Sequence, residues 1–74
     1  MRLTPRQVAA LVAYVECRRA SVAARRLGIT TGTLRGHLAA CRDEYGSIER
    51  AIYVGTRDGW LRSVEIDATP AELQ

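Results

Sequence analysis

The segment from residue 20 to residue 45 constrains the fold most, because it divides into two short helical patterns around Gly28-Ile29-Thr30-Thr31. Glycine readily adopts the left-handed conformation that ends a helix, and threonine readily caps the next helix. The sequence therefore predicts one helix from about residue 20 to residue 27 and another from about residue 31 to residue 44, joined by a tight turn.

The later of these two helices is predicted to have two unlike faces. One face holds apolar residues at one-turn spacing, which we expect to point into a core: Leu34, Leu38, Cys41 and Tyr45. At about 100° per residue, the opposite arc holds mostly small residues. It consists of Gly32, Arg35, Gly36, Ala39, Ala40 and Asp43, with His37 and Arg42 on its flanks. Such an arc permits close approach to another surface, and Arg35 is its long hydrogen-bond donor.

A first helix is predicted to support this pair. Thr4 and Gln7 form a T-x-x-Q capping box around Pro5, which suits the first helical position, and Leu3 can pack on Val8. The apolar stripe of this helix consists of Val8, Leu11, Val12 and Val15. We expect the helix to run to about Glu16.

A fourth helix is predicted after Gly46, with Ser47 as its cap and its end near Gly59. Its buried face consists of Ile48, Ala51, Ile52 and Gly55, and Trp60 and Leu61 are expected to close the core. The predicted fold is therefore an all-α, four-helix helix-turn-helix domain over residues 1–61. Residues 62–74 are predicted to form a short extended or disordered C-terminal tail.

The charges are distributed unevenly along the 74 residues. Residues 1–42 carry eight arginines and one acid, and residues 43–74 carry three arginines and seven acids, so +7 is followed by −4 and the net charge is +3. A basic front half favours a polyanionic partner, although a membrane surface would also attract it. The longest apolar run, Val8 to Val15, is far shorter than the roughly 20 residues that span a bilayer, so no transmembrane helix is expected.

The cysteines and the N-terminal residues indicate a cytoplasmic protein. Glu16-Cys17-Arg18-Arg19 follows the apolar run where a signal peptide would have small residues at its cleavage site. Cys17 and Cys41 are interpreted as small buried hydrophobic residues rather than a structural disulfide.

The order of LTPRQ, a first helix, ARRLGI, TGTLRGHL and GTRDGWL resembles the LuxR-type DNA-binding domain over residues 3–61. The resemblance implies a four-helix module that reads the major groove with its third helix and often dimerises through its fourth. Val22, Gly32 and Gly36 differ from the residues usual in that family, and the turn after Gly46 is about two residues shorter.

The middle segment is also similar to the helix-turn-helix of LysR-type regulators and of sigma-factor region four. Each of these likenesses implies binding to double-stranded DNA. The sequence therefore predicts a bacterial or phage-encoded transcriptional regulator that recognises specific DNA sequences. The alternative is a protein-interaction module of the same fold that docks on RNA polymerase or on another regulator without reading DNA.

The candidate DNA contacts fall into two groups. Arg35 is the first candidate for a base contact, because a guanidinium can bind guanine through two hydrogen bonds, and Gly36 and Ala39 match other reading positions of the family. The candidate phosphate contacts are hydroxyls near a helix start and charged groups: Thr31, Thr33, Arg42, Arg25, Arg18 and Arg19. A solvated surface position is the ordinary alternative for each of these arginines, and Thr30 or Thr31 can instead serve as the helix cap.

The sequence predicts no metal site, no catalytic activity and one candidate dimer face. His37 and Cys41 have the spacing of paired metal ligands, but with one histidine and two cysteines in the chain we expect no metal and no other cofactor. Asp43 and Glu44 diverge on a helix and no activated nucleophile is evident, so we expect no enzyme. The outward arc of the fourth helix, with Arg50, Tyr53 and Arg57, is the candidate face for a homodimer.

Overall fold

The computed structural model describes residues 2–61, and all regular structure in this part of the chain is helical. The four helices are α1 (Pro5–Cys17), α2 (Ala20–Leu27), α3 (Thr31–Tyr45) and α4 (Ile48–Asp58). The predicted all-α class with four helices is therefore confirmed. The predicted extended or disordered tail, residues 62–74, lies outside the described residues.

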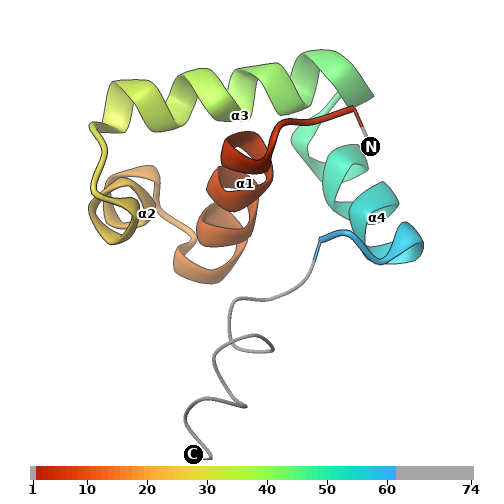
Figure 1. Cartoon of the computed structure of the whole chain (residues 1–74), viewed down its shortest axis with the longest axis horizontal. Helices are drawn as coiled ribbons and strands as arrows, with labels where there is room; N and C mark the ends of the chain where they lie inside the picture. The colour runs from red at the N-terminus through yellow and green to blue at the C-terminus, as the bar shows by residue number, and fades with distance from the viewer. Residues whose placement is uncertain (1, 62–74) are drawn as a thin grey trace, which may run out of the picture.

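The helices are arranged around α1. Figure 1 shows α3 lying across the other three helices, with α1 beneath its middle, α2 beneath its first half and α4 near its last turn. Only residues 28–30 separate α2 from α3, which is the layout of a helix-turn-helix unit. One long side of α3 is thereby left uncovered by the other helices.

The helix starts follow the predicted capping chemistry. The Thr4 hydroxyl accepts a hydrogen bond from the Gln7 backbone N–H at 3.2 Å, and the Gln7 side chain accepts one from the Thr4 N–H at 2.9 Å. Thr30, rather than Thr31, caps α3 by accepting from the Thr33 N–H at 3.1 Å. Ser47 caps α4 in the same way, at 3.0 Å from the Arg50 nitrogen.

The helix ends use left-handed residues, and one of them is not glycine. Gly28, Gly46 and Gly59 end α2, α3 and α4 with positive φ, as predicted for the glycines. Arg18 ends α1 with a φ of 66°, and its backbone N–H donates to the Tyr14 carbonyl oxygen at 2.7 Å. This turn brings the chain directly from α1 into α2, which begins at Ala20.

The core consists of two clusters. The first joins α1, α2 and α3 and is built almost entirely of methyl groups: Ala10, Ala13, Ala23, Ala24 and Leu34. The second joins α1, α3 and α4 around Leu3, Leu11, Cys41 and Ala51. Trp60 and Leu61 pack against the second cluster, as predicted, and the Trp60 ring stacks on Tyr45 with the ring centroids 5.8 Å apart.

The predicted apolar stripe of α1 is wrong at Val15, which is 39% exposed. The buried residues of α1 are instead four consecutive ones, from Ala10 to Ala13. Four consecutive residues cover almost the whole circumference of a helix. The middle of α1 is therefore enclosed by its neighbours around almost its whole circumference, and not on one face only.

Candidate nucleic-acid interface

The outward crest of α3 consists of small residues and one acid. Gly32, Gly36 and Asp43 are exposed, and Ala40 beside them is half-buried. An added Cβ at Gly32 or Gly36 would meet no heavy atom within 4 Å among the described residues. We call Gly32, Gly36, Ala40 and Asp43 the crest, and its low profile allows the α3 backbone to come close to a partner surface.

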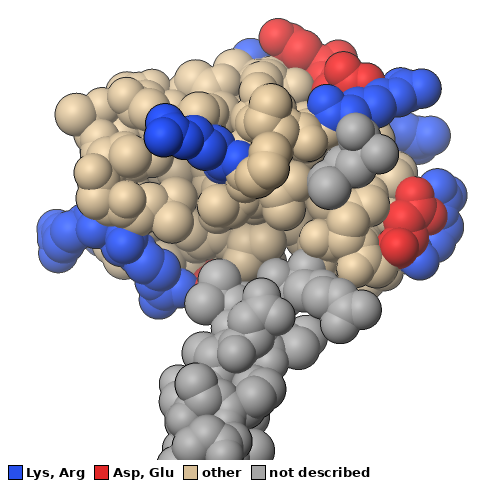
Figure 2. Space-filling view, viewed as in Figure 1, with Lys and Arg blue, Asp and Glu red and all other residues tan. Residues whose placement is uncertain are grey.

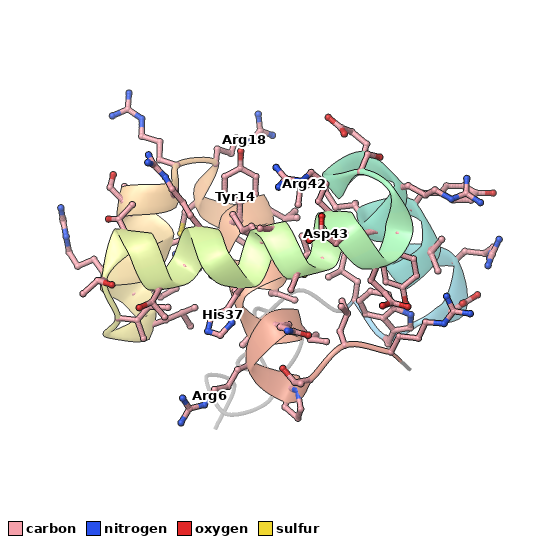
Figure 3. All side chains as sticks on the ribbon, turned by 90° about the horizontal axis from the view of Figure 1, so that it is seen from above. Arg6, Tyr14, Arg18, His37, Arg42 and Asp43 are labelled. Atoms are coloured by element: carbon pink, nitrogen blue, oxygen red, sulfur yellow. The ribbon has the colours of Figure 1, made fainter. Side chains whose placement is uncertain are left out.

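A groove of about 470 Å³ runs along one flank of α3. Tyr14 and Arg18 at the end of α1 and Ala20 at the start of α2 form one wall, and Ile48 at the start of α4 adds to it. The α3 side supplies Arg35, Leu38, Ala39 and Arg42. Figure 3 shows Tyr14, Arg18 and Arg42 on the same side of α3. We call this hollow the arginine groove.

Local geometry explains why three arginines meet there. Arg35 and Arg42 are seven residues apart, which places them about two turns apart on the same flank of α3. Arg18 reaches the groove because the left-handed turn at the end of α1 places it at the junction with α2. Four of the residues predicted to contact DNA, Arg18, Arg35, Ala39 and Arg42, are thus brought together.

The charges in the arginine groove are poorly neutralised. Arg18 and Arg35 make no ion pair with the described residues, and none of the residues that line the groove is acidic. Arg42 has only a long contact, 3.9 Å from its Nε to the Asp43 carboxylate, and both side chains are largely exposed. Exposed pairs of this kind contribute at most about 1 kcal/mol. The three guanidinium groups are therefore available to an anionic partner.

The opposite flank of α3 has a second, smaller hollow of about 290 Å³. Its polar lining comes from Arg6, Thr33 and His37, and its apolar lining comes from Ala9, Leu27 and Ile29. Figure 3 shows Arg6 and His37 on the side of α3 opposite Tyr14 and Arg18. Thr33 is therefore separated from the arginine groove, and its hydroxyl accepts a hydrogen bond from the Thr30 hydroxyl at 2.9 Å.

The remaining predicted contacts are more dispersed. Arg19 and Arg25 are exposed but do not line the arginine groove, and Thr31 is half-buried at the start of α3. Gly36 lies on the crest. Arg26 is held by Glu16 of α1 at 2.7 Å, so of the two adjacent arginines of α2 it is Arg25 that remains without an ion pair to the described residues.

Tyr14 and Arg6 are not among the residues predicted from the sequence to contact DNA. Both lie on α1, which the sequence presents only as a capped support helix, and nothing in their local spacing marks them as functional. Only the packing of α1 under α3 places them beside the two flanks. Arg6 belongs to the LTPRQ motif and to the excess of arginine in residues 1–42, whereas no feature of the sequence points to Tyr14.

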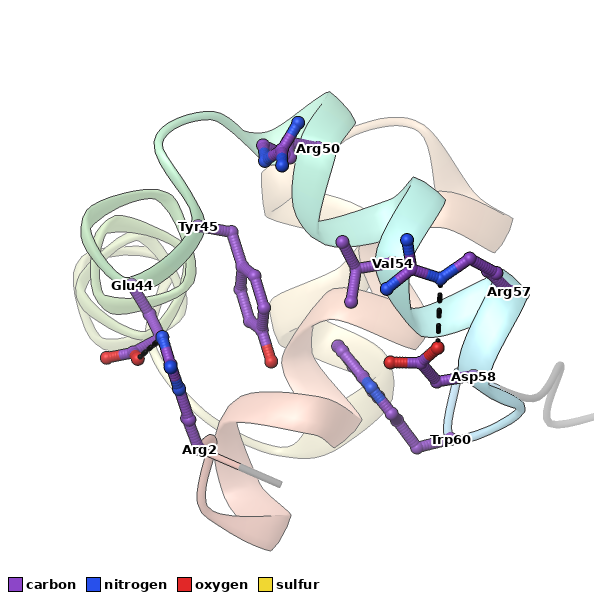
Figure 4. A pocket seen from close by; sticks show the side chains of 8 residues that line it. All are labelled: Arg2, Glu44, Tyr45, Arg50, Val54, Arg57, Asp58 and Trp60. Carbon is purple, nitrogen blue, oxygen red and sulfur yellow. Dashed lines mark hydrogen bonds and ion pairs between the residues drawn. The ribbon is translucent and has the colours of Figure 1, made fainter.

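At the end of the molecule formed by the last turn of α3 and by α4, most of the charged side chains are paired with one another. A hollow of about 660 Å³ lies between the end of α3 and α4, where Arg2 pairs with Glu44 at 3.1 Å and Arg57 with Asp58 at 3.0 Å (Figure 4). On the face shown in Figure 2, acidic side chains lie mostly at this α4 end, next to arginines. These paired charges make the α4 end less suited to a polyanion than the arginine groove.

The predicted dimer face on α4 is exposed. Tyr53 is 61% exposed. The guanidinium carbon of Arg57 lies over the Tyr53 ring, 5.6 Å from the ring centroid. The hydrogen bond from Arg57 to Asp58 raises the pKa of Arg57 further above its ordinary value, so this side chain stays charged. Arg50, one turn before Val54, is also exposed.

The sulfur groups lie away from these surfaces. Cys41 is fully buried, and its thiol donates a weak hydrogen bond to the Gln7 carbonyl oxygen at 3.7 Å. Burial raises the pKa of Cys41, so it remains a protonated thiol. Cys17 is a free thiol that packs against the first core cluster, and His37 lies in the second hollow. Residues 2–61 contain no group of three or more histidine, cysteine or acidic side chains placed to hold a metal.

Within residues 2–61, every helix is too short or too polar to cross a membrane. No family model, curated protein or solved structure matches this chain.

Proposed function

We propose that this chain binds double-stranded DNA with α3 in the major groove and acts as a small transcriptional regulator. The observation that carries the proposal is the convergence of Arg18, Arg35 and Arg42 in one groove beside an exposed helix. An α-helix fits the major groove, and arginines along its flank meet the phosphates at the groove edge. Phosphate contacts of this kind supply most of the affinity of such complexes.

The two flanks of α3 suit the two strands that border a major groove. The crest would face the base pairs, and the arginine groove would face the phosphates of one strand. Arg6, Thr33 and His37 on the other flank would face the second strand. The start of α2 also lines the arginine groove at Ala20, and this helix lacks a side-chain cap, so its first amide N–H groups add donors for a phosphate.

The alternative function is a protein-interaction module that docks on RNA polymerase or on another regulator. Two observations favour it: the crest lacks hydrogen-bonding side chains other than Asp43, and the α4 end combines aromatic rings with paired charges. The arginine groove argues against it, because Arg18 and Arg35 make no ion pair with the described residues and Arg42 has only a long one, and such charges are costly to bury in a protein interface that lacks matching acids.

Titration of a labelled duplex with the chain at several salt concentrations tests the proposal. We expect saturable binding that weakens steeply as salt increases. Arg35→Gln and Arg42→Gln should each lower the affinity about fivefold, as expected for an exposed charge pair. Each should also reduce the salt slope by about 0.9, which corresponds to one phosphate contact.

Arg2→Gln is the matched control for this experiment. It removes the same charge, but Arg2 is paired with Glu44 near the last turn of α3 and does not line the arginine groove. We expect it to leave the salt slope within error of the parent chain. Absence of saturable duplex binding near physiological salt would contradict the proposal and support the protein-interaction alternative.

The exposed face of α4 leads to an additional expectation about assembly. Tyr53, with the Arg57 guanidinium over its ring, and Arg50, about one turn earlier on α4, would form the centre of a homodimer contact, since exposed aromatic and arginine side chains are typical of interfaces. Sedimentation over micromolar concentrations is expected to show a mass that rises toward the dimer, and Tyr53→Ala should shift the chain to the monomer. A mass that stays at the monomer value throughout would remove the dimer.

A further inference from the structure

We infer that this domain holds duplex DNA by its phosphate backbone and discriminates little between base sequences. The inference rests on the proposed function and concerns the class of DNA that the α3 surface accepts. It follows from where the hydrogen-bonding side chains of α3 lie relative to its crest.

The crest carries almost no groups that can identify a base. Recognition of bases in the major groove depends on side chains such as arginine, asparagine and glutamine, which form paired hydrogen bonds with base edges. Gly32, Gly36 and Ala40 have no such groups. Asp43 is an acceptor only and lies in the last turn of α3, where its 78% exposed carboxylate would repel the DNA backbone. The crest can therefore fit the shape of the major groove, but it has few groups that could distinguish one base pair from another.

Arg35, the one long donor of the outward arc, lines the arginine groove with Arg18 and Arg42. Counting about 100° per residue from the buried Leu34, Arg35 points sideways from α3 rather than toward the crest. A guanidinium in this position meets the edge of the DNA groove, where the phosphates are. We therefore assign Arg35 to a contact with the phosphate backbone of the DNA, in place of the base contact that the sequence predicts.

Tyr14 completes the arginine groove as a phosphate site. Its side chain is half-buried, and its hydroxyl makes no hydrogen bond with the described residues. Figure 3 places it between α3 and Arg18. A phenol hydroxyl donates well to a phosphate oxygen, and three surrounding arginines supply the positive charge. These contacts are the same for every sequence, because every nucleotide step presents the same phosphate.

Selection of the full chain against a random duplex pool, followed by affinity measurements on unrelated duplexes, tests the inference. We expect no enriched motif and affinities that agree within about tenfold, whereas specific binders prefer their sites by at least about a thousandfold. Enrichment of one motif with a preference of that size would overturn the inference and leave the proposed function intact. Absence of binding to every duplex would overturn both.

Two variants separate backbone contacts from base contacts. Tyr14→Phe should weaken binding to every duplex by the same factor of about threefold, without a change in the salt slope, because no charge is lost. Arg35→Gln should weaken every duplex equally and also lower the slope by about 0.9. A loss confined to particular sequences for either variant would contradict the inference.

Asp43→Asn is expected to strengthen DNA binding, whereas the two preceding variants are expected to weaken it. Removal of the crest carboxylate should raise the affinity for all duplexes by about threefold, since a like charge near the phosphates is lost. Glu49→Gln, an equal change of charge on the exposed side of α4, is the control and should have little effect. A gain that depends on cytosine content would show that Asp43 reads bases, and would overturn the inference.

Discussion

Leu34→Ala is expected to lower the free energy of unfolding by about 3 kcal/mol. Leu34 is fully buried and is the largest side chain of the first core cluster, whose other buried members are alanines. The alanine neighbours are too short to fill a cavity, and the longer side chains that pack against the cluster, Leu27, Ile29 and Leu38, lie at its partly exposed edge, so most of the space left by the leucine would remain. A domain of this size has a small margin of stability, and a loss of about 3 kcal/mol would unfold much of the population.

Urea denaturation followed by circular dichroism measures this loss. Val15→Ala is the control, because Val15 is on α1 but largely exposed, and the gain in helix propensity offsets part of any lost contact. We expect it to change the free energy of unfolding by less than about 0.5 kcal/mol. A loss as large as that of Leu34→Ala would mean that Val15 belongs to the core, as the sequence pattern had predicted.

Gly55→Ala is expected to destabilise the chain by about 2 kcal/mol, although alanine is the better helix former. A Cβ at Gly55 would lie 3.0 Å from two atoms of the Trp60 ring and even closer to the Cβ of Leu61. The Leu61 N–H also donates to the Gly55 carbonyl oxygen at 3.0 Å, so this close approach is fixed by the backbone. The added methyl group would therefore push Trp60 and Leu61 off the second core cluster.

Gly36→Ala is the matched control, because both glycines lie inside helices but an added Cβ at Gly36 meets open space. It is expected to stabilise the chain by about 1 kcal/mol. Thermal unfolding measures both variants, and the fluorescence of Trp60 should shift to longer wavelength only in Gly55→Ala. Equal stabilisation by the two substitutions would show that Trp60 and Leu61 do not depend on contact with Gly55.

The helices and their ends follow from local chemistry, which explains why the sequence predicts them well. The capping box at Thr4, the caps at Thr30 and Ser47, and the glycines after α2, α3 and α4 depend on neighbouring residues only. The position of α1 depends on long-range packing instead. The pattern of its apolar residues predicts one buried face, whereas burial of consecutive residues becomes visible only once α2, α3 and α4 are placed around it.

The candidate site was predicted in part. Helical spacing predicts that Arg35 and Arg42 share a flank of α3, and the charge of Arg18 predicts a phosphate contact, but not its position beside that flank. The sequence could not show that Tyr14 lies with them, because that depends on the packing of α1 under α3. Nor does the sequence show whether an arginine of α3 lies on the flank or points toward the bases. Neighbouring positions on a helix differ by about 100° in direction, so a shift of one position separates the two cases.

At the turn that ends α1, the stability of the fold and the proposed binding of DNA favour different residues at position 18. A φ of 66° costs an arginine about 1 kcal/mol or more, and glycine would adopt it without that cost. Glycine would also remove a guanidinium from the arginine groove. Arg18→Gly would thus raise the stability of the fold and lower the proposed affinity for DNA. Selection for stability alone would favour glycine at this position, whereas selection for binding to an anionic partner would favour arginine.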